Sequence, residues 1–222
     1  MTNWKKNLIY CCFCVVVLYF GAVRPLTHQA SHVVKSRTSQ TANEKTPRSH
    51  HSKHHQQAAV ERSMRRPINW KKSSETKPYP DLTKVKNFNV LVKIKKNRTY
   101  LRDGKKVIYT MYSSAGNYHR DAQTGKQTSD TPTGTFYVQA ERGANFFNSS
   151  LNEGANYYVS WLNHGEYLFH SVPTSADGSY NLKEAKKLGK STGSHGCVRL
   201  SVADAQWMME HLPVGTKVTI ED

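Results

Sequence analysis

Residues 24–80 limit which part of this chain can fold, because they hold few large apolar side chains. The segment is rich in Ser, Thr, Gln, His, Lys and Arg and shows no sustained hydrophobic period. A segment of this composition cannot bury enough apolar surface to offset the entropy lost on folding. We therefore predict that residues 24–80 form a disordered basic linker and that the folded domain lies within residues 81–222.

The amino-terminal residues 1–23 have the pattern of an export signal. Lys5 and Lys6 precede an apolar run of sixteen residues without a charge, Leu8–Val23. This pattern is typical of a signal peptide, and the run is slightly short for a spanning helix, which needs about 17–25 residues. A buried core helix is the alternative, but nothing nearby could cover it. We predict a signal peptide or a signal-anchor, which places the domain outside the cytoplasm.

The positive charge of the chain lies mostly outside the predicted domain. Residues 1–80 contain 14 Lys and Arg against 3 Asp and Glu, whereas residues 81–222 contain 18 against 13. This asymmetry predicts that the linker attaches the protein to an anionic wall polymer or a membrane surface. Nucleic acid would suit the same charge, but the export signal argues against it. The histidine-rich run at residues 49–55 lacks the paired spacing of a zinc site, so we interpret it as solvated linker.

Short β-forming runs follow one another through the predicted domain. Its strands are expected at residues 90–95, 98–101, 107–113, 135–139, 157–162, 166–170 and 216–220, and loops at residues 116–130 and 141–156. A short helix is expected over residues 182–188. One firm helix is expected over residues 202–212, because Ser201 can cap its start and Pro213 ends it. The sequence therefore predicts a mainly β domain with one firm helix after residue 197.

Cys197 is the only cysteine outside the first fifteen residues. It has no disulfide partner within the domain, so in an exported protein it is either an intermolecular link or a reactive thiol. The thiolate is the nucleophilic form, and a free thiol is mostly protonated near neutral pH, so something must take its proton. We favour His170 as the base, because it ends another predicted strand and can face the sulfur across a cleft. His195, on the same turn as the cysteine, is expected to orient or pack.

The residues around Cys197 suit a sharp turn that could bind an oxyanion. Gly193 and Gly196 allow such a turn, and the successive amides of His195, Gly196 and Cys197 could point at one spot. Arg199 could hold a substrate carboxylate in bidentate fashion, or it could form a surface or core-edge ion pair instead. Two other interpretations of the histidines and the cysteine remain open. They are a zinc site, which would need a fourth ligand, and a buried inert cysteine.

The string Ser194-His195-Gly196-Cys197-Val198-Arg199, with His170 upstream, resembles the signature of the YkuD-type L,D-transpeptidases. The resemblance covers about residues 89–220 and includes Thr131-Pro132-Thr133-Gly134, which is similar to the strand entry of that family. One difference is the stretch of 23 residues between His170 and Ser194, which is longer than usual in the family. We place the extra length in a loop at residues 176–187, beside the donor groove.

The resemblance implies a YkuD-like β-sandwich or barrel of mixed strands, with no metal and no other cofactor. It implies Cys197 as the nucleophile and His170 as the base, with the Ser171 carbonyl orienting that base. His195 and Gly196 would line the site. The remaining implied site residues are Tyr157 or Tyr158 at the oxyanion, and Ser194 and Arg199 at the substrate.

The implied activity is that of a peptidoglycan L,D-transpeptidase acting in cell wall biogenesis. The cysteine would attack a stem peptide between its third residue, a diamino acid, and the following D-alanine. An amine of a neighbouring stem would then resolve the thioester into a 3→3 cross-link, and carbapenems would acylate the same sulfur. An L,D-carboxypeptidase, in which water replaces the amine, and a non-catalytic wall-binding module are the alternatives. Donor and acceptor stem peptides are thus the expected partners, and the protein is expected to be a monomer.

Overall fold

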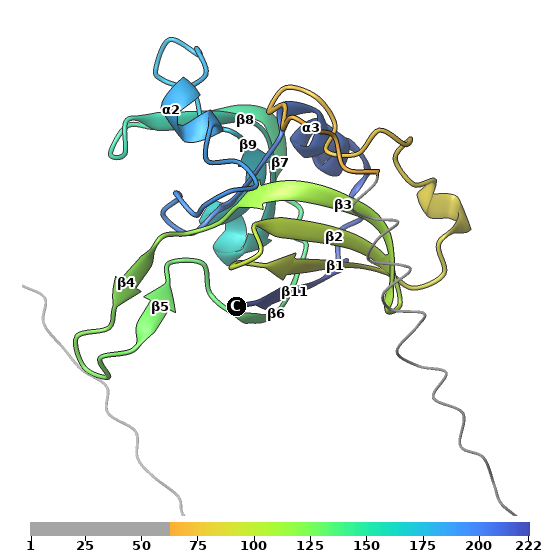
Figure 1. Ribbon diagram of the computed structural model, residues 1–222, viewed down its shortest axis with the longest axis horizontal. Coiled ribbons are helices and arrows are strands. Elements are labelled where there is room, and N and C mark those ends of the chain that lie inside the picture. Colours follow the sequence, from red (N-terminus) through yellow and green to blue (C-terminus); the bar gives the residue numbers. More distant parts are fainter. Residues whose placement is uncertain (1–62) are drawn as a thin grey trace, which may run out of the picture. The chain divides into compact units, whose positions relative to one another are not determined.

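The structure, a computed structural model, describes residues 63–222. Their main feature is a nine-stranded mixed sheet in the order β6-β11-β1-β2-β3-β10-β9-β8-β7, beside a separate pair formed by β4 and β5 (Figure 1). The strands are β1 (Phe88–Lys93), β2 (Arg98–Asp103), β3 (Lys106–Ser114), β4 (Tyr118–Arg120), β5 (Gln127–Ser129), β6 (Gly134–Tyr137), β7 (Arg142–Asn148), β8 (Glu153–Leu162), β9 (Tyr167–Ser171), β10 (Val198–Leu200) and β11 (Lys217–Glu221).

Helices make up a small part of the described chain. They are α2 (Leu182–Ala185), α3 (Val202–His211) and the 3₁₀ turns η1 (Leu82–Lys84) and η2 (Asn163–Gly165). Within residues 63–222, no helix is long and apolar enough to cross a membrane. The predicted fold class, mainly β with one firm helix after Cys197, is confirmed.

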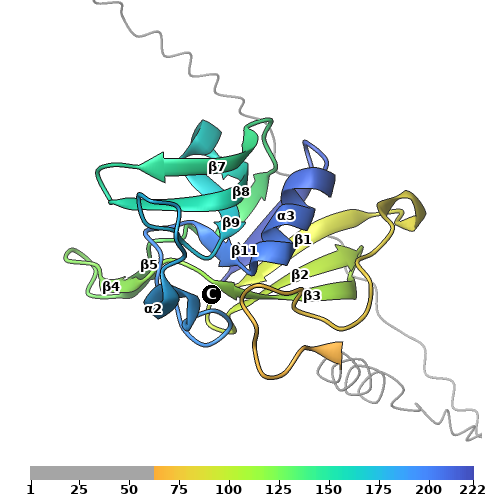
Figure 2. The same cartoon turned by 90° about the horizontal axis from the view of Figure 1, so that it is seen from above.

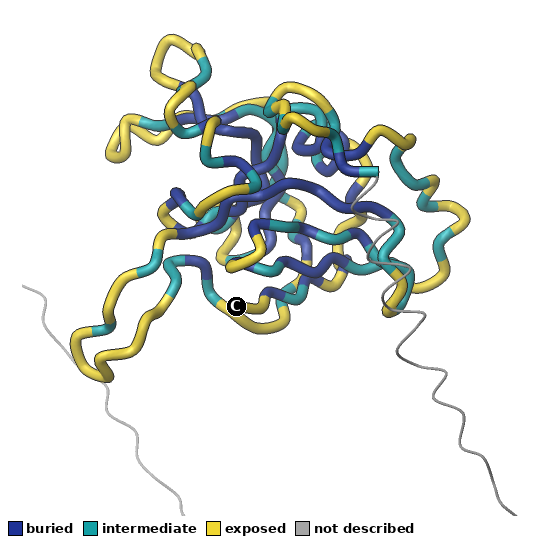
Figure 3. The backbone as a smooth tube through the Cα atoms, in the orientation of Figure 1, coloured by how far each residue is buried: buried dark blue, intermediate teal, exposed yellow. Residues whose placement is uncertain are grey.

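Helix α3 lies between the β7–β9 end of the curled sheet and the β1–β3 end (Figure 2). Its start is capped as predicted, because the Ser201 hydroxyl accepts a hydrogen bond from the Asp204 amide at 3.1 Å. Met208 and Leu212 of this region are buried in one cluster with side chains of both ends of the sheet. Burying a side chain of this size stabilises a fold by about 1.5–3 kcal/mol. The helix therefore joins the two ends of the sheet through a common core (Figure 3).

Both segments expected to be loops contain strands. Residues 116–130 include the β4–β5 pair, and residues 141–156 include β7, which pairs antiparallel with β8 from Arg142↔Val159 to Asn148↔Glu153. β7 is the edge strand of the large sheet, and its residues are exposed or half-buried. An edge strand without a buried face has no alternating hydrophobic pattern, which is why the sequence did not indicate it.

Residues 63–80, which we assigned to the disordered linker, are folded against the domain. Ser74 and Glu75 are 1% and 0% exposed. The Ser74 hydroxyl donates to the Asp204 carboxylate at 2.5 Å, and the Glu75 carboxylate accepts the Thr110 amide at 2.5 Å. This segment is held by polar groups that satisfy buried polar groups of the domain, and by Met64, which is buried in an apolar cluster of the domain. Hydrophobic patterning cannot reveal the polar pairing. The predicted leader and residues 24–62 of the linker lie outside the described residues.

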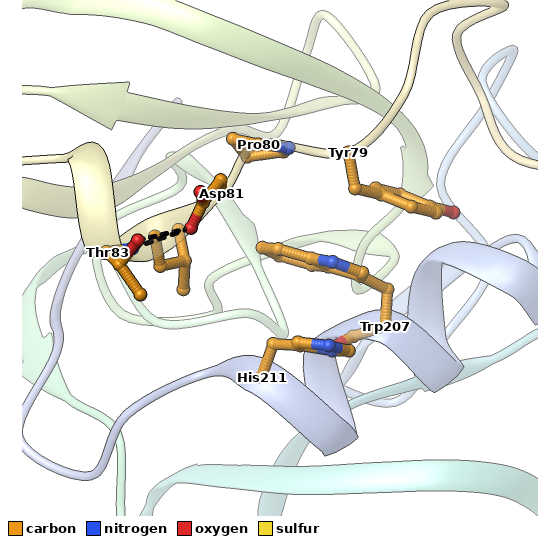
Figure 4. A pocket seen from close by; sticks show the side chains of 7 residues that line it. Tyr79, Pro80, Asp81, Thr83, Trp207 and His211 are labelled. Atoms are coloured by element: carbon orange, nitrogen blue, oxygen red, sulfur yellow. Dashed lines mark hydrogen bonds between the residues drawn. The ribbon is translucent and has the colours of Figure 1, made fainter.

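Tyr79 fixes the end of this segment on α3 (Figure 4). Its hydroxyl donates to Asp204 at 2.7 Å, and its ring stacks on Trp207 with 5.2 Å between centroids. Trp207 stacks in turn on His211 at 5.3 Å. Burial raises the pKa of the Asp204 carboxyl, while the hydrogen bonds from Ser74 and Tyr79 act in the opposite direction. The segment thus supplies the partners that make a buried carboxyl group tolerable.

Candidate active site

The pairing of β9 with β10 places Cys197 beside the strand that carries His170. The two strands are parallel, with Arg199 opposite His170. The sulfur of Cys197, one residue before β10, accepts a hydrogen bond from the Leu168 amide at 3.4 Å. Side chains two residues apart on a strand share a face, and Leu168, His170 and Cys197 all line one groove.

This groove has a volume of about 720 Å³, within the range of small-molecule and cofactor sites. Its lining includes Phe146, Tyr158, Leu168, His170, His195 and Cys197. The groove therefore joins residues of β7, β8, β9 and the turn before β10, which are up to about 50 residues apart in the chain.

Cys197 is a protonated thiol at neutral pH in this environment. Burial raises its pKa to about 11, although the Leu168 amide and the Arg199 charge act in the opposite direction. The thiol donates a long hydrogen bond to the Glu166 carbonyl, with 3.7 Å between sulfur and oxygen. Nucleophilic attack by this sulfur therefore requires a base, as the sequence predicted.

His170 has the protonation state of a base. Its side chain is 2% exposed, and burial together with the nearby Arg199 charge lowers its pKa to about 3. The neutral ring donates from Nδ1 to the Ser171 carbonyl at 2.6 Å, which leaves Nε2 as the acceptor. The Phe146 ring packs edge-on against it at 5.5 Å. The interaction expected between His170 and the Ser171 carbonyl is present in the structure.

The turn before Cys197 is held by hydrogen bonds within it. The Ser194 hydroxyl donates to the Cys197 carbonyl at 2.5 Å and accepts the Gly196 amide at 3.1 Å. Gly196 has φ +134°, and a Cβ there would lie 2.7 Å from the Tyr167 ring. The Gly196 amide is therefore used by Ser194 rather than free to bind an oxyanion. The Ser194 hydroxyl likewise shapes the turn, although Ser194 still borders the groove that we expected it to serve as a substrate contact.

Thr131 explains the Thr-Pro-x-Gly similarity in physical terms. Its buried hydroxyl donates to the Gly196 carbonyl at 2.7 Å and accepts the Gly116 amide at 2.7 Å. Thr131 thereby connects Gly116, which follows β3, to the turn at residues 194–197, which we call the nucleophile turn. Nothing in the sequence assigned this hydroxyl a contact.

We expect Thr131→Val to destabilise the domain by about 2–4 kcal/mol, because the Gly116 amide and the Gly196 carbonyl each lose their buried partner. Valine keeps the shape of the side chain, so packing changes little. Thr131→Ser keeps the hydroxyl and is the matched control, expected within about 1 kcal/mol of the original protein. Urea unfolding measures both values. Equal midpoints for the two variants would contradict this role.

The groove contains Tyr158 rather than Tyr157. Tyr157 has φ +56° and packs against the hydrophobic core, whereas Tyr158 lines the groove with its ring 5.6 Å from that of Phe146. Gly143 makes room for it, since a Cβ there would lie 2.8 Å from the Tyr158 ring. Of the two tyrosines expected at the oxyanion, Tyr158 therefore faces the groove and Tyr157 does not. The positive φ at Tyr157 sets which side chain faces the groove.

Arg199 is not available to hold a substrate carboxylate. It is 1% exposed, and it donates from Nη2 to both carboxylate oxygens of Glu153 at 2.7 Å. Nη1 donates to Glu184 at 2.7 Å and to the Gly193 carbonyl at 2.8 Å. The alternative considered for this residue, an ion pair, is what the structure contains. Because Nη1 and Nη2 are both engaged and Nε is buried without a partner, the guanidinium has no free fork for a substrate carboxylate.

His195 lies where the sequence suggested, exposed at the edge of the groove. The extra loop contains α2, and none of residues 176–187 lines the groove, contrary to its expected position beside bound donor. The loop is connected to the site through Glu184, which accepts a hydrogen bond from Arg199. The sequence also missed Glu153, since no local pattern marks a carboxylate that pairs across the fold. Within residues 63–222, no group of three or more His, Cys, Asp or Glu side chains could hold a metal ion.

Comparison with known proteins gives consistent results. The sequence model of the YkuD family, described as the L,D-transpeptidase catalytic domain, matches residues 87–220. A Bacillus subtilis (strain 168) protein, YciB, whose name assigns it to the L,D-transpeptidases, is 45% identical over 163 residues, covering 72% of this chain and 78% of its own.

Solved structures with a similar fold have lower identity. A structure of the L,D-transpeptidase LdtMt1 in complex with imipenem has a TM-score of 0.47 at 20% identity, and covers 61% of this chain and 59% of its own. An L,D-transpeptidase from Mycobacterium smegmatis has a TM-score of 0.46 at 19% identity, with coverage of 61% and 59%. This chain thus spans about three fifths of the length of these proteins. The matched residues 87–220 contain His170, Cys197 and the groove between them, and the chain belongs to the L,D-transpeptidase catalytic domain family.

Proposed function

We propose that this protein is a peptidoglycan L,D-transpeptidase that forms 3→3 cross-links through a thioester on Cys197. The observation that carries the proposal is the placement of Cys197 and a buried, neutral His170 on adjoining parallel segments that face one groove. Membership of the family supports the same reaction class. The donor stem peptide would bind in the groove first, and the acceptor stem would bind while the acyl group of the donor is attached to Cys197.

In the first half-reaction, His170 takes the thiol proton on Nε2 while its Nδ1–H stays on the Ser171 carbonyl. The thiol hydrogen turns from the Glu166 carbonyl to the ring before the transfer. The sulfur then attacks the carbonyl carbon of the diamino acid. The bond to D-alanine breaks as His170 returns the proton to the leaving amine, and a thioester remains.

In the second half-reaction, an amine of a neighbouring stem attacks the thioester carbonyl. His170 takes a proton from this amine, the carbon–sulfur bond breaks, and the thiolate recovers that proton. In both steps the Tyr158 hydroxyl is our candidate donor to the carbonyl oxygen as it becomes negative, because this side chain lines the groove.

We further propose that the leader exports the domain and that the basic linker holds it against an anionic wall polymer or the membrane. The sequence supports this, since residues 1–80 hold 14 Lys and Arg against 3 Asp and Glu. Export, the wall contact and the monomeric state are predictions from sequence that fractionation and light scattering would measure.

The experiment that tests the function is intact-mass analysis of the full chain mixed with a stem tetrapeptide, and separately with imipenem. We expect the tetrapeptide to add its acyl tripeptide to the protein and imipenem to add its full mass. Both additions should vanish in Cys197→Ala, because alanine has no nucleophilic side-chain atom.

The alternatives give different products. Adding an amine acceptor should yield a 3→3 linked dimer. Tripeptide release with acceptor present and no dimer would favour the L,D-carboxypeptidase. Folded protein that binds wall fragments but forms no adduct on Cys197 would favour the wall-binding module and refute the proposal.

A further inference from the structure

Arg199 is a buried cation next to the two reactive side chains. It lies in the middle of β10, opposite His170 in the parallel register and two residues after Cys197. Its side chain is 2% exposed. Paired residues of parallel strands point to the same face of the sheet, so the guanidinium sits on the side of the groove without being part of its lining.

The guanidinium joins three segments that border the site. Glu153, which accepts the bidentate pair at 2.7 Å, begins β8 and forms part of the groove wall. Glu184, at 2.7 Å, belongs to α2 in the long loop, and Lys187 adds a second cation to it at 2.8 Å. The Gly193 carbonyl, at 2.8 Å, leads into the nucleophile turn. The Arg199 side chain therefore connects β10 to the groove wall, to the long loop and to the nucleophile turn.

Stability alone does not account for this arrangement. Taking three charged groups out of water costs several kcal/mol per ion, and well-packed apolar residues of similar volume often stabilise a fold as much or more. The planar guanidinium of Arg199 forms hydrogen bonds in fixed directions. It therefore fixes the relative positions of its two carboxylate partners, which apolar packing cannot do. The network is thus suited to set geometry rather than to add stability.

The charge of Arg199 also acts on the reactive pair. It lowers the pKa of His170, which keeps the ring neutral but weakens it as a base, and it lowers the pKa of Cys197, which favours the thiolate. Glu153 acts on the thiol in the opposite direction. The charged or titratable groups that interact with the sulfur or line the groove around it include Glu153, Glu166, Tyr158, Tyr167, His170, His195 and Arg199.

We propose that Arg199 is a positioning residue: it holds Glu153, Glu184 and the Gly193 carbonyl in the one arrangement in which His170 and Cys197 face a correctly shaped groove. The inference rests on the proposed function where it concerns acylation of Cys197. In this role Arg199 does not need to contact the substrate. It also gives the long loop a role, because Glu184 connects that loop to the site.

The first test compares Arg199→Lys with Arg98→Lys in the full chain. Lysine keeps the charge but loses the fork, so we expect the second-order rate of Cys197 acylation by imipenem to fall about 10–100-fold. Arg98 donates to the Gly189 carbonyl and stacks on Tyr112 outside the groove, so its lysine variant controls for the loss of a guanidinium. It should stay within about threefold of the original rate. An Arg199→Lys protein that is folded and reacts within threefold of the original overturns the proposal.

The second test does not depend on the enzyme's reaction. Alkylation of Cys197 by iodoacetamide is followed against pH, after Cys11, Cys12 and Cys14 are replaced by serine in every variant. We expect Glu153→Gln to move the alkylation profile to lower pH, because a negative charge near the sulfur is removed, and Arg199→Met to move it to higher pH. A residue that only stabilised the fold would shift both variants in the same direction or neither, and that result overturns the proposal.

The two tests separate the two hypotheses. Failure of imipenem and tetrapeptide to acylate the original protein would refute the proposed function, while the alkylation profiles would still measure the field of Arg199. If Arg199→Met does not fold, Glu153→Gln and Arg199→Lys still decide the outcome, since each keeps part of the network and most of the side-chain volume.

Discussion

Replacing His170 with alanine lowers the rate of Cys197 acylation by about 10²–10⁴-fold at pH 7. The pKa of the thiol is about 11, so only about one molecule in 10⁴ carries a thiolate without the help of a base. The imidazole is neutral and its Nε2 is free because Nδ1–H is held by Ser171. Stopped-flow measurement of imipenem acylation in the full chain gives the rate.

Two variants and the pH dependence make this result specific. His170→Gln keeps most of the volume but has no base, so it should lose as much activity as His170→Ala. His195→Ala removes an exposed ring and should cost less than about tenfold. Between pH 7 and pH 10, the rate of the His170 variants should rise about tenfold per pH unit, because hydroxide then generates the thiolate. A His170→Ala rate within threefold of the original would mean that another group activates the sulfur.

The second large effect concerns the amino-terminal boundary of the domain. A chain that starts at Asp81, as the sequence analysis alone would suggest, should be less stable by about 3–5 kcal/mol than one that starts at Ser63. It loses the Ser74 and Tyr79 hydroxyls, which donate to buried Asp204, and the Glu75 carboxylate, which accepts the Thr110 amide. Urea unfolding of the two chains measures the difference.

A matched pair of point variants isolates the polar contact from the loss of chain. In the chain that starts at Ser63, Ser74→Ala should cost about 1–3 kcal/mol, because Asp204 and the Tyr112 amide both lose a buried partner. Ser73→Ala, one residue away and only half-buried, should cost less than about 1 kcal/mol. Identical midpoints for the chains that start at Ser63 and Asp81 would show that residues 63–80 add nothing to the fold.

Most of the contacts that could not be predicted from the sequence join residues that are far apart in the chain. The two carboxylates that pair with Arg199 are 46 and 15 residues away in the chain. Whether a cation faces substrate or a buried partner depends on which carboxylates the fold brings to it, and no spacing rule encodes that. The same applies to Ser74, whose partner Asp204 is 130 residues away. Residues 63–80 therefore have the composition of a linker, although these contacts hold them on the domain.

The backbone conformation determines which of the two neighbouring tyrosines faces the groove. Strand periodicity predicts that neighbouring residues face opposite sides, so sequence could narrow the choice to Tyr157 or Tyr158 but not decide between them. The positive φ at Tyr157 and the open space at Gly143 turn Tyr158 toward the groove. Such a conformation is costly for a tyrosine and exists only because the surrounding sheet enforces it.

From the sequence alone follow the mainly β fold, the helix after the nucleophile turn, and the presence of Cys197 and His170 in one site. These depend on local information: strand and helix patterns, a single cysteine, and a short motif whose residue types suit acyl transfer. The partner of Arg199, the tyrosine in the groove and the true start of the domain were decided only by the tertiary structure. The physical reason is that a polar or charged side chain is defined by its partner, and the partner is chosen by the fold rather than by the neighbouring sequence.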